Sequence, residues 1–362
     1  MGFKCGIVGL PNVGKSTLFN ALTKKINAEA ANYPFCTIEP NEGTVPVPDD
    51  RVEILSKISK SKKTIPTTLT FFDIAGLVRG ASKGEGLGNK FLSHIREVDA
   101  IIHVVRCFED SNITHVNNAI DPYNDVSIIN TELILSDLEM TSKLKTNFEK
   151  LKKKGDKAAE KKLYAANLVL NQLDAGLPAI SSPKISDIVD DLKEFNLLSL
   201  KPVIYVCNVD EKSIIEGNKF TKDLSESIKE NIILISAEIE SQISSLHSKD
   251  QIEYLESLGL KQSGLNKIIK TGYQTLRLLT YFTSGEKETR AWTVTSGSKA
   301  PDAAGKIHSD FQSGFIRAET ISYDDFVECE GEIRAKELGK MRSEGKEYVV
   351  QDGDVMHFLF NN

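Results

Sequence analysis

The stretch Gly9-Leu10-Pro11-Asn12-Val13-Gly14-Lys15-Ser16-Thr17 decides the fold of this 362-residue chain. It matches the pattern G-x-x-x-x-G-K-[ST], in which backbone N–H groups of a glycine-rich loop surround phosphate oxygens. The apolar run Phe3–Gly9 predicts a buried strand before the loop, and Thr17–Lys24 predicts a helix after it. The Lys15 ammonium should reach the β- and γ-phosphates as a catalytic group, and the Ser16 hydroxyl should ligate Mg²⁺. This loop and the start of the helix should contribute Asn12, Val13, Gly14, Lys15, Ser16 and Thr17 to the nucleotide site.

Further short apolar runs alternate with helical patterns along the chain. Such alternation indicates an α/β fold with a mostly parallel sheet and helices on both faces. We expect one nucleotide-binding domain over residues 1–125 and 199–280. Its other predicted strands are Thr68–Ile74, Ala100–Cys107, Pro202–Cys207 and Ile232–Ile235.

Residues 126–198 interrupt this alternation with two helical patterns. Apolar residues recur at spacings of three and four on both sides of Gly155. The pattern predicts an inserted antiparallel hairpin of the coiled-coil type, whose first helix has about 26 residues and a length of roughly 39 Å. Lysines crowd its expected tip, where Lys152, Lys153, Lys154 and Lys157 could contact an anionic surface, although such helix faces are often merely solvated.

Residues 281–362 have a different pattern, typical of a small α+β module. Strands are expected at Thr289–Ser296 and Tyr348–Phe360, with short helices near Ala300–Phe311 and Gly331–Leu338.

Composition excludes several classes of protein. The 45 Lys and Arg against 51 Asp and Glu give a net charge of −6, which argues against a dedicated DNA-binding surface. A hydrophobic content of 40% excludes a wholly disordered chain. No apolar run approaches the ~18 residues of a membrane span, and the first residues have no secretory signal, so we expect a cytoplasmic protein. The five cysteines contain no C-x-x-C pair, and only Cys36 stands in a polar loop.

The segment Phe72-Asp73-Ile74-Ala75-Gly76 follows the second predicted strand. A carboxylate at this point suits a Mg²⁺-linked Asp73, and the backbone N–H of Gly76 suits the γ-phosphate. The next residue is Leu77, where many P-loop GTPases have the Gln that orients the attacking water. Another group must therefore perform that task.

The segment Asn208-Val209-Asp210-Glu211 follows a later strand, where a guanine-specific protein has N-K-x-D. Val209 replaces the Lys whose stem packs on the base, and Glu211 replaces the Asp that accepts from guanine. Ser236 and Ala237 fit the last loop that contacts the base. The nucleotide base should therefore contact Asn208, Val209, Glu211, Ser236 and Ala237, with weakened discrimination for guanine.

These motifs together resemble the YchF or Obg-like ATPase family. The resemblance rests on the P-loop, on Asn32–Asn41, on the glycine-dense segment Asp73–Asn89 and on Asn208–Glu211. It extends essentially over the whole chain. The resemblance implies a G domain with a helical insertion and a C-terminal TGS domain of β-grasp type.

The resemblance also implies a function and further site residues. It implies preference for ATP over GTP, slow hydrolysis, and association with ribosomes and their large subunit. It implies that Thr37 ligates Mg²⁺ and the γ-phosphate, and that His115 is a mobile-loop residue able to position water. His94 and His103 lie in apolar patterns and are expected to be structural. Asn12 occupies the position where potassium-activated P-loop GTPases hold K⁺, which makes K⁺ a candidate cofactor.

Two alternatives remain open at this point. The chain could be a GTP-specific switch, or a non-enzymatic ribosome-binding adaptor whose nucleotide is structural. A metabolic kinase is disfavoured because no site for a second substrate is readable. We expect a monomer without a membrane partner.

Overall fold

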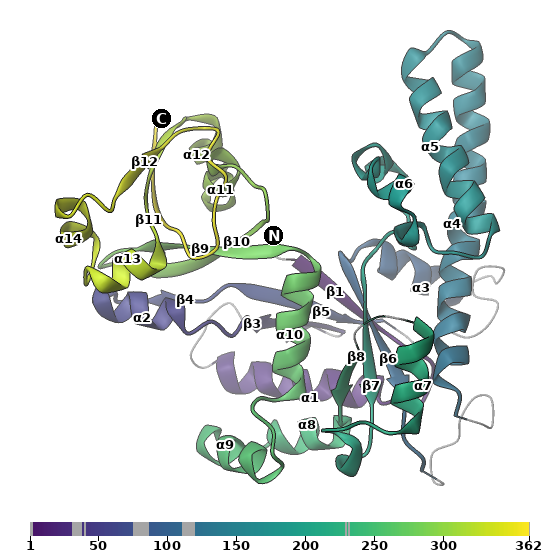
Figure 1. Ribbon diagram of the computed structural model, residues 1–362, viewed down its shortest axis with the longest axis horizontal. Helices are drawn as coiled ribbons and strands as arrows, with labels where there is room; N and C mark the ends of the chain where they lie inside the picture. The colour runs from purple at the N-terminus through teal and green to yellow at the C-terminus, as the bar shows by residue number, and fades with distance from the viewer. Residues whose placement is uncertain are drawn as a thin grey trace.

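A seven-stranded sheet forms the centre of the amino-terminal part (Figure 1). The computed structural model describes residues 3–30, 38–39, 41–74, 87–110, 120–228, 230 and 232–361. The strand order is β2-β3-β5-β1-β6-β7-β8, and the five strands from β5 to β8 are parallel. The five strands predicted for the nucleotide-binding domain form within one residue of their expected bounds. The strands are β1 (Phe3–Val8), β2 (Ile38–Glu39), β3 (Glu42–Pro46), β5 (Thr68–Asp73), β6 (Ala100–Arg106), β7 (Val203–Asn208) and β8 (Ile232–Ile235).

Helices cover both faces of this sheet, as the neighbours of two glycines show. A Cβ added to Gly6 would lie against Val98, which follows α3, whereas one added to Gly272 of α10 would lie 3.7 Å from the Cys5 sulfur. Neighbouring strand residues point to opposite faces, so α3 and α10 lie on different sides. The surrounding helices are α1 (Lys15–Ala30), α3 (Leu87–Arg96), α7 (Lys219–Ile228), α8 (Ala237–Ile243), α9 (Ser248–Ser257) and α10 (Gly264–Thr275).

A long helical hairpin projects from the sheet (Figure 1). Its helices are α4 (Pro122–Lys153), with 32 residues, and α5 (Lys157–Asp174), with 18. Asp121 caps α4 by accepting from the Asn124 N–H at 3.0 Å, and Asp156 caps α5. Gly155 has φ +90°, a conformation that suits the tight turn between them.

The helix α4 starts four residues before the expected boundary at residue 126 and belongs to two units. Its first turns pack Val126, Ile129 and Leu133 into the cores beside the sheet. The buried Asp137 then accepts from the backbone N–H groups of Leu198 and Ser199 at 3.0 and 2.7 Å. These bonds tie the hairpin to the chain that returns toward β7 through η1 (Ala179–Ser181), α6 (Pro183–Ser186) and η2 (Val189–Phe195).

A second sheet of six strands forms the carboxyl-terminal part, in the order β12-β11-β13-β9-β10-β4. The strand expected over Tyr348–Phe360 is shorter than predicted, because Gly353 has φ +90° and a turn occupies residues 351–354. Strand β11 has no counterpart among the sequence predictions. The elements are β9 (Leu278–Ser284), β10 (Thr289–Thr295), α11 (Ala300–Ile307), α12 (Ser309–Ser313), β11 (Phe315–Ile321), α13 (Tyr323–Glu328), α14 (Glu332–Glu337), β12 (Arg342–Glu344) and β13 (Val355–Phe360).

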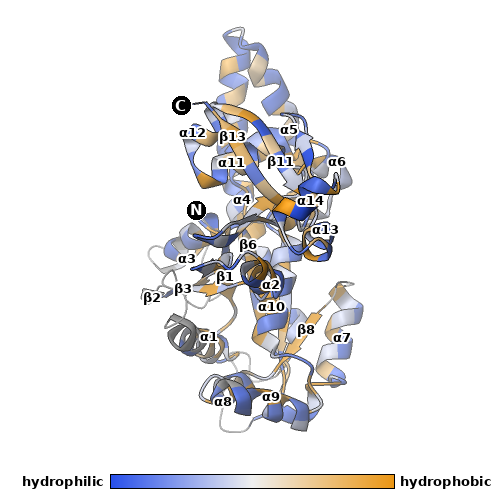
Figure 2. Cartoon of the chain, turned by 90° about the vertical axis from the view of Figure 1, so that its left-hand side faces the viewer, coloured by the Kyte–Doolittle hydropathy of each residue, from blue (hydrophilic) through white to orange (hydrophobic). Residues whose placement is uncertain are grey.

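Residues 51–65 lie in the amino-terminal half of the sequence but complete the second sheet. Strand β4 (Thr64–Ile65) pairs in parallel with β10, and helix α2 (Arg51–Ile58) lies beneath α13 (Figure 2). Val52 and Leu55 of α2 are buried in one cluster with Phe282 and Phe326. The packing therefore differs from the domain boundary expected at residue 281. Strand β9 of the second sheet begins at Leu278, and residues 51–65, which were expected in the first domain, pack with that sheet.

No helix in the described ranges combines the length and the apolar character that crossing a bilayer requires.

Candidate functional site

The loop between β1 and α1 has the backbone conformation of a phosphate cradle. Asn12 and Gly14 both have positive φ, +64° and +95°. A Cβ at position 14 would lie 2.2 Å from the Asn208 side-chain nitrogen, which excludes any larger residue. The loop then enters α1, where the Leu18 N–H donates to the Gly14 carbonyl at 3.0 Å. The first N–H groups of α1 therefore face the same side as the loop, and this end of a helix attracts anions.

Lys15 is held by the carboxylate of Asp73. The Lys15 Nζ donates to the Asp73 Oδ1, and the two side chains are only 10% and 15% exposed. Asp73 reaches this position because β5 pairs with β1 in a register that places it beside Ile7. This ion pair lies beside the phosphate loop and could separate when a nucleotide binds. The Lys15 ammonium could then contact a phosphate, and the Asp73 carboxylate could contact a cation.

A cavity of about 520 Å³ adjoins this pair. Lys15, Ser16 and Asp73 line one part of it, together with Glu42 of β3. An exposed serine hydroxyl and a carboxylate are oxygen donors of the kind that Mg²⁺ accepts, since Mg²⁺ uses one or two protein ligands beside phosphate and water. No group of three or more Asp, Glu, His or Cys side chains suited to a metal occurs among the described residues. The donor set fits a metal held jointly with a nucleotide.

Asn208 braces the loop from the neighbouring part of the sheet. Its Nδ2 donates to the Val13 carbonyl at 3.0 Å, and its Oδ1 accepts from the Ala237 N–H at 2.9 Å. Ser236 caps α8 by accepting from the Ile239 N–H at 3.4 Å. The expected base-contacting loops thus meet the P-loop, but both functional atoms of the Asn208 amide are already engaged with the protein.

The structure places Val209 and Glu211 differently from each other. The Val209 side chain is buried in an apolar cluster with Ile214 and Leu224, and its N–H donates to the Ile235 carbonyl at 2.8 Å. Glu211 begins η3 (Glu211–Ser213) and is exposed. The cap of this short helix is Asp210, whose carboxylate accepts from the Ser213 N–H at 3.0 Å.

Several predicted residues lie outside the described part of the chain. They are Thr37, Gly76 and His115, together with Cys36 and Leu77. Thr17 is described, and it is exposed in the first turn of α1.

The two histidines that were expected to be structural, His94 and His103, have different surroundings. His103 of β6 is 1% exposed, and burial lowers its pKa to about 3, in agreement with a structural role. His94 of α3, for which the sequence predicts a structural role, is exposed and lines the cavity beside Lys15. The sequence offered no signal for this, because the residues that form the cavity wall come from four separate segments.

Comparisons with known proteins agree with this geometry. Residues 4–136 match a family described as "50S ribosome-binding GTPase", and residues 278–361 match "YchF-GTPase_C", a "Protein of unknown function".

Full-length relatives cover the whole chain. It is 53% identical to "Ribosome-binding ATPase YchF" of Haemophilus ducreyi and 52% identical to the proteins of the same name from Escherichia coli O157:H7 and Bacillus subtilis, with 100% of both chains covered in each case. A solved structure of the Schizosaccharomyces pombe YchF GTPase is 40% identical, with a TM-score of 0.87 over 99% of this chain and 98% of that one. The P-loop, its partners on β5 and β7, and this similarity from end to end show that the chain belongs to the YchF family.

Proposed function

We propose that this chain is a ribosome-binding, Mg²⁺-dependent ATPase that couples its nucleotide state to ribosome binding. The observation that carries the proposal is the Lys15–Asp73 pair beside a phosphate loop with the required positive φ values. Full-length relatives with the name "Ribosome-binding ATPase YchF" support the partner. Such a partner would place the chain in the cytoplasm.

The residues around the P-loop have separate roles in this proposal. Lys15 binds the β- and γ-phosphates, while Ser16, Asp73 and Thr37 provide oxygens for Mg²⁺. The metal, when bound, neutralises charge that develops on the phosphate oxygens. The backbone N–H of Gly76 would donate to the γ-phosphate, and His115 would position the attacking water, because Leu77 has no polar group for that task.

The segment Asn208–Glu211, which we place next to the nucleotide base, favours ATP over GTP. Guanine presents two N–H donors that need a carboxylate acceptor, whereas adenine presents none there. The exposed Glu211 can turn to solvent, so an adenine leaves no buried charge unpaired. The N–H groups of Val209 and Ala237 already donate to the Ile235 carbonyl and to Asn208, so backbone carbonyls of these segments would accept from the adenine amino group.

The experiment that tests this choice is a comparison of ATP and GTP affinities. A hydrogen-bonded edge is worth about 1–3 kcal/mol, so ATP should bind about 5- to 150-fold more tightly. Tighter binding of GTP would favour the alternative of a GTP-specific switch. Single-turnover hydrolysis of bound ATP separates an enzyme from an adaptor with a structural nucleotide.

The inserted hairpin and the carboxyl-terminal sheet are the parts that we assign to partner binding. We assign α4 and α5 to a coiled-coil insertion and the residues from 278 onward to a TGS domain of β-grasp type. The mixed six-stranded sheet with α11 packed on one face supports the second assignment.

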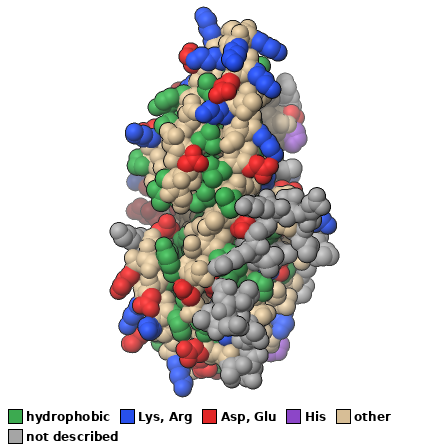
Figure 3. Space-filling view, turned by 90° about the vertical axis from the view of Figure 1, so that its right-hand side faces the viewer, with side chains coloured by type: hydrophobic (Ala, Val, Ile, Leu, Met, Phe, Trp, Pro, Cys, Tyr) green, Lys and Arg blue, Asp and Glu red, His purple; other side chains and the backbone are tan. Residues whose placement is uncertain are grey.

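The tip of the hairpin carries a cluster of lysines, seen as blue side chains in Figure 3. Lys152 pairs with Glu160 at 2.7 Å, whereas Lys153, Lys154 and Lys157 are exposed. These charges are positioned to contact an anionic part of the ribosome, such as rRNA.

A charge reversal tests this contact. Changing Lys152, Lys153, Lys154 and Lys157 to Glu should weaken cosedimentation with ribosomes and reduce its dependence on salt. A matched control changes four exposed lysines on other helices and loops, with the same change in net charge. If both variants bind as the wild type does, the hairpin surface is only solvated. The control residues are Lys219, Lys222, Lys249 and Lys261.

A further inference from the structure

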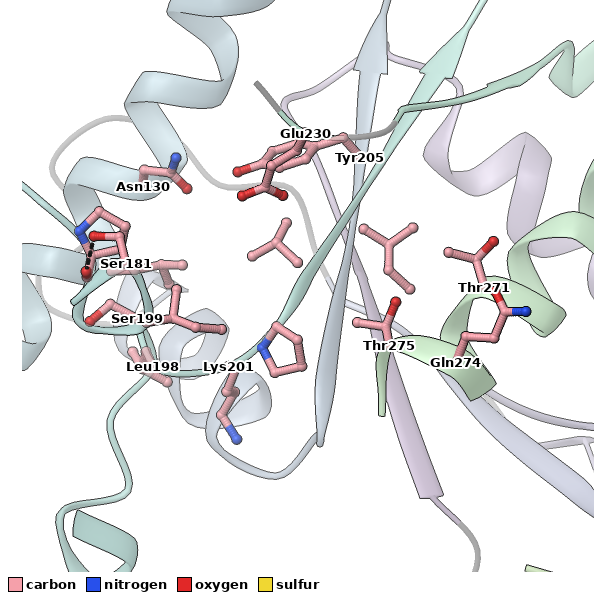
Figure 4. Close-up of a pocket in the computed structure, with 16 residues that line it drawn as sticks. Asn130, Ser181, Leu198, Ser199, Lys201, Tyr205, Glu230, Thr271, Gln274 and Thr275 are labelled. Atoms are coloured by element: carbon pink, nitrogen blue, oxygen red, sulfur yellow. Dashed lines mark hydrogen bonds between the residues drawn. The ribbon is translucent and has the colours of Figure 1, made fainter. Parts of the chain in front are cut away.

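A cavity of about 710 Å³ lies at the opposite end of the sheet from the P-loop. It opens beside Lys201 and Pro202, where β7 begins, whereas Asn208 at the other end of β7 braces the P-loop. The base of α4, the segment around residues 178–181 and the last turn of α10 form its walls (Figure 4). We call this cavity the amino-end groove. It lies between the inserted hairpin and the nucleotide-binding domain.

The floor and one rim of the amino-end groove are apolar. Leu133, Leu198 and Ile204 line it and are buried, while Ile180 at its edge is 41% exposed. A concave surface lined by apolar side chains and a few polar groups is typical of a binding site. The groove can therefore accept apolar side chains.

Some polar groups at the groove are already satisfied within the protein. The Lys201 Nζ donates to the backbone carbonyls of Arg96 and Val98, so its charge is turned away from the groove. The Ser199 hydroxyl donates to the Asp137 carboxylate at 2.7 Å. Neither group is free to bind a ligand.

Glu230 is an exposed residue that lines the groove. It lies beside the Tyr205 hydroxyl and near Asn130 (Figure 4), and Tyr205 bonds to the Asn130 side chain. Among the residues that the structure describes, no Lys, Arg or His forms an ion pair with it. Desolvation raises the pKa of the Glu230 carboxyl and of the Tyr205 hydroxyl. A cation in the groove would relieve that cost, and an anion would increase it.

The helix α10 adds uncharged polar groups on the opposite wall. Thr271, Gln274 and Thr275 have the spacing of residues on one helix face, and all three line the groove. Their hydroxyl and amide groups can bond to a peptide backbone. A carboxylate at one end, an apolar floor and this polar wall match a polypeptide that carries a basic side chain next to apolar ones.

We propose that the amino-end groove binds a basic segment of a protein partner, with a Lys or Arg side chain of that segment at Glu230. The inference rests on the proposed ribosome binding, and it specifies a protein rather than RNA at this surface. The basic hairpin and the end of the groove at Glu230 would then contact different components of the same particle, because phosphates would be repelled from Glu230.

The first test reverses the charge at the groove. Glu230→Lys is compared with Glu226→Lys, which makes the same change of charge at an exposed position of α7 outside the groove. Purified ribosomes serve as the probe, in the presence of a non-hydrolysable ATP analogue. We expect about tenfold weaker cosedimentation for Glu230→Lys and less than a twofold change for Glu226→Lys. Melting temperatures verify that both variants fold.

Other outcomes of this test are equally informative. Tighter binding by Glu230→Lys would show that the groove faces RNA and would overturn the inference. Equal binding by both variants would also overturn it, while leaving ribosome binding intact. Absence of ribosome binding by the wild-type chain would instead refute the proposed function.

A second test identifies the class of partner directly. A photoreactive benzoyl-phenylalanine at Thr275 is irradiated in the presence of ribosomes, and the same residue at the exposed Ser257 of α9 is the control. A crosslinked product from position 275 that protease degrades and nuclease does not is the expected result. A nuclease-sensitive product, or no product above the control, would refute docking of a protein segment in the groove.

Discussion

The strongest test of how the chain is divided is the substitution Leu55→Ala in α2. Leu55 is 0% exposed and packs with Phe282 and Phe326 of the second sheet, although it precedes them by more than 200 residues. A buried Leu→Ala change costs about 2–5 kcal/mol, and a value of about 3 kcal/mol is reasonable for a short helix whose main buried apolar residues are Val52 and Leu55. That loss of stability should increase about 150-fold the fraction of molecules in which the second sheet is locally unfolded.

Hydrogen exchange followed by mass spectrometry measures this effect in separate regions. Peptides from β9, β10, β11 and β13 should exchange much faster in Leu55→Ala, while peptides from β1, β6 and β7 should change little. The control is Leu224→Ala, which empties a fully buried position beside β7 and should have the opposite pattern. Faster exchange confined to the first sheet in Leu55→Ala would refute the assignment of α2 to the second sheet.

Three further predictions concern the nucleotide site and the core. Asn208→Ala removes the hydrogen-bond partner of the Val13 carbonyl and of the Ala237 N–H. ATP affinity, measured with a fluorescent analogue, should therefore fall about 10- to 100-fold. An unchanged affinity would contradict the role of Asn208 in holding the loop. Hydrolysis should be faster in K⁺ than in Na⁺ at equal ionic strength, and Asn12→Ala should abolish that difference; equal rates in the wild type would exclude a K⁺ site. The pKa of His103 is about 3 in the folded chain, below its unfolded value of 6.5, so the unfolded state takes up a proton first as pH falls. About 2 kcal/mol of stability should therefore be lost between pH 7 and pH 5, and chemical denaturation of His103→Phe should lack that part of the loss.

Local sequence was sufficient for the phosphate loop and for the strands next to it. The glycines, the lysine and the serine of Gly9–Thr17 act through their own backbone and side chains, so their order in the chain predicts the cradle. The parallel strands were readable for a similar reason, because a strand buried on both faces is a continuous apolar run. The helical hairpin was readable from its periodicity and from Gly155, although the start of α4 was placed four residues too late.

Tertiary structure alone decided which segments meet. Strand β4 has two residues and joins β10 from more than 200 residues away, a pairing that no local pattern encodes. The same is true of the Asn208 amide, whose hydrogen bonds to Val13 and Ala237 depend on how three loops converge. The position of Glu230 beside Tyr205 depends on the pairing of β8 with β7, in which Ile232 lies beside Tyr205. Propensity and periodicity act over a few residues, whereas these contacts exist only after distant surfaces have been buried against each other.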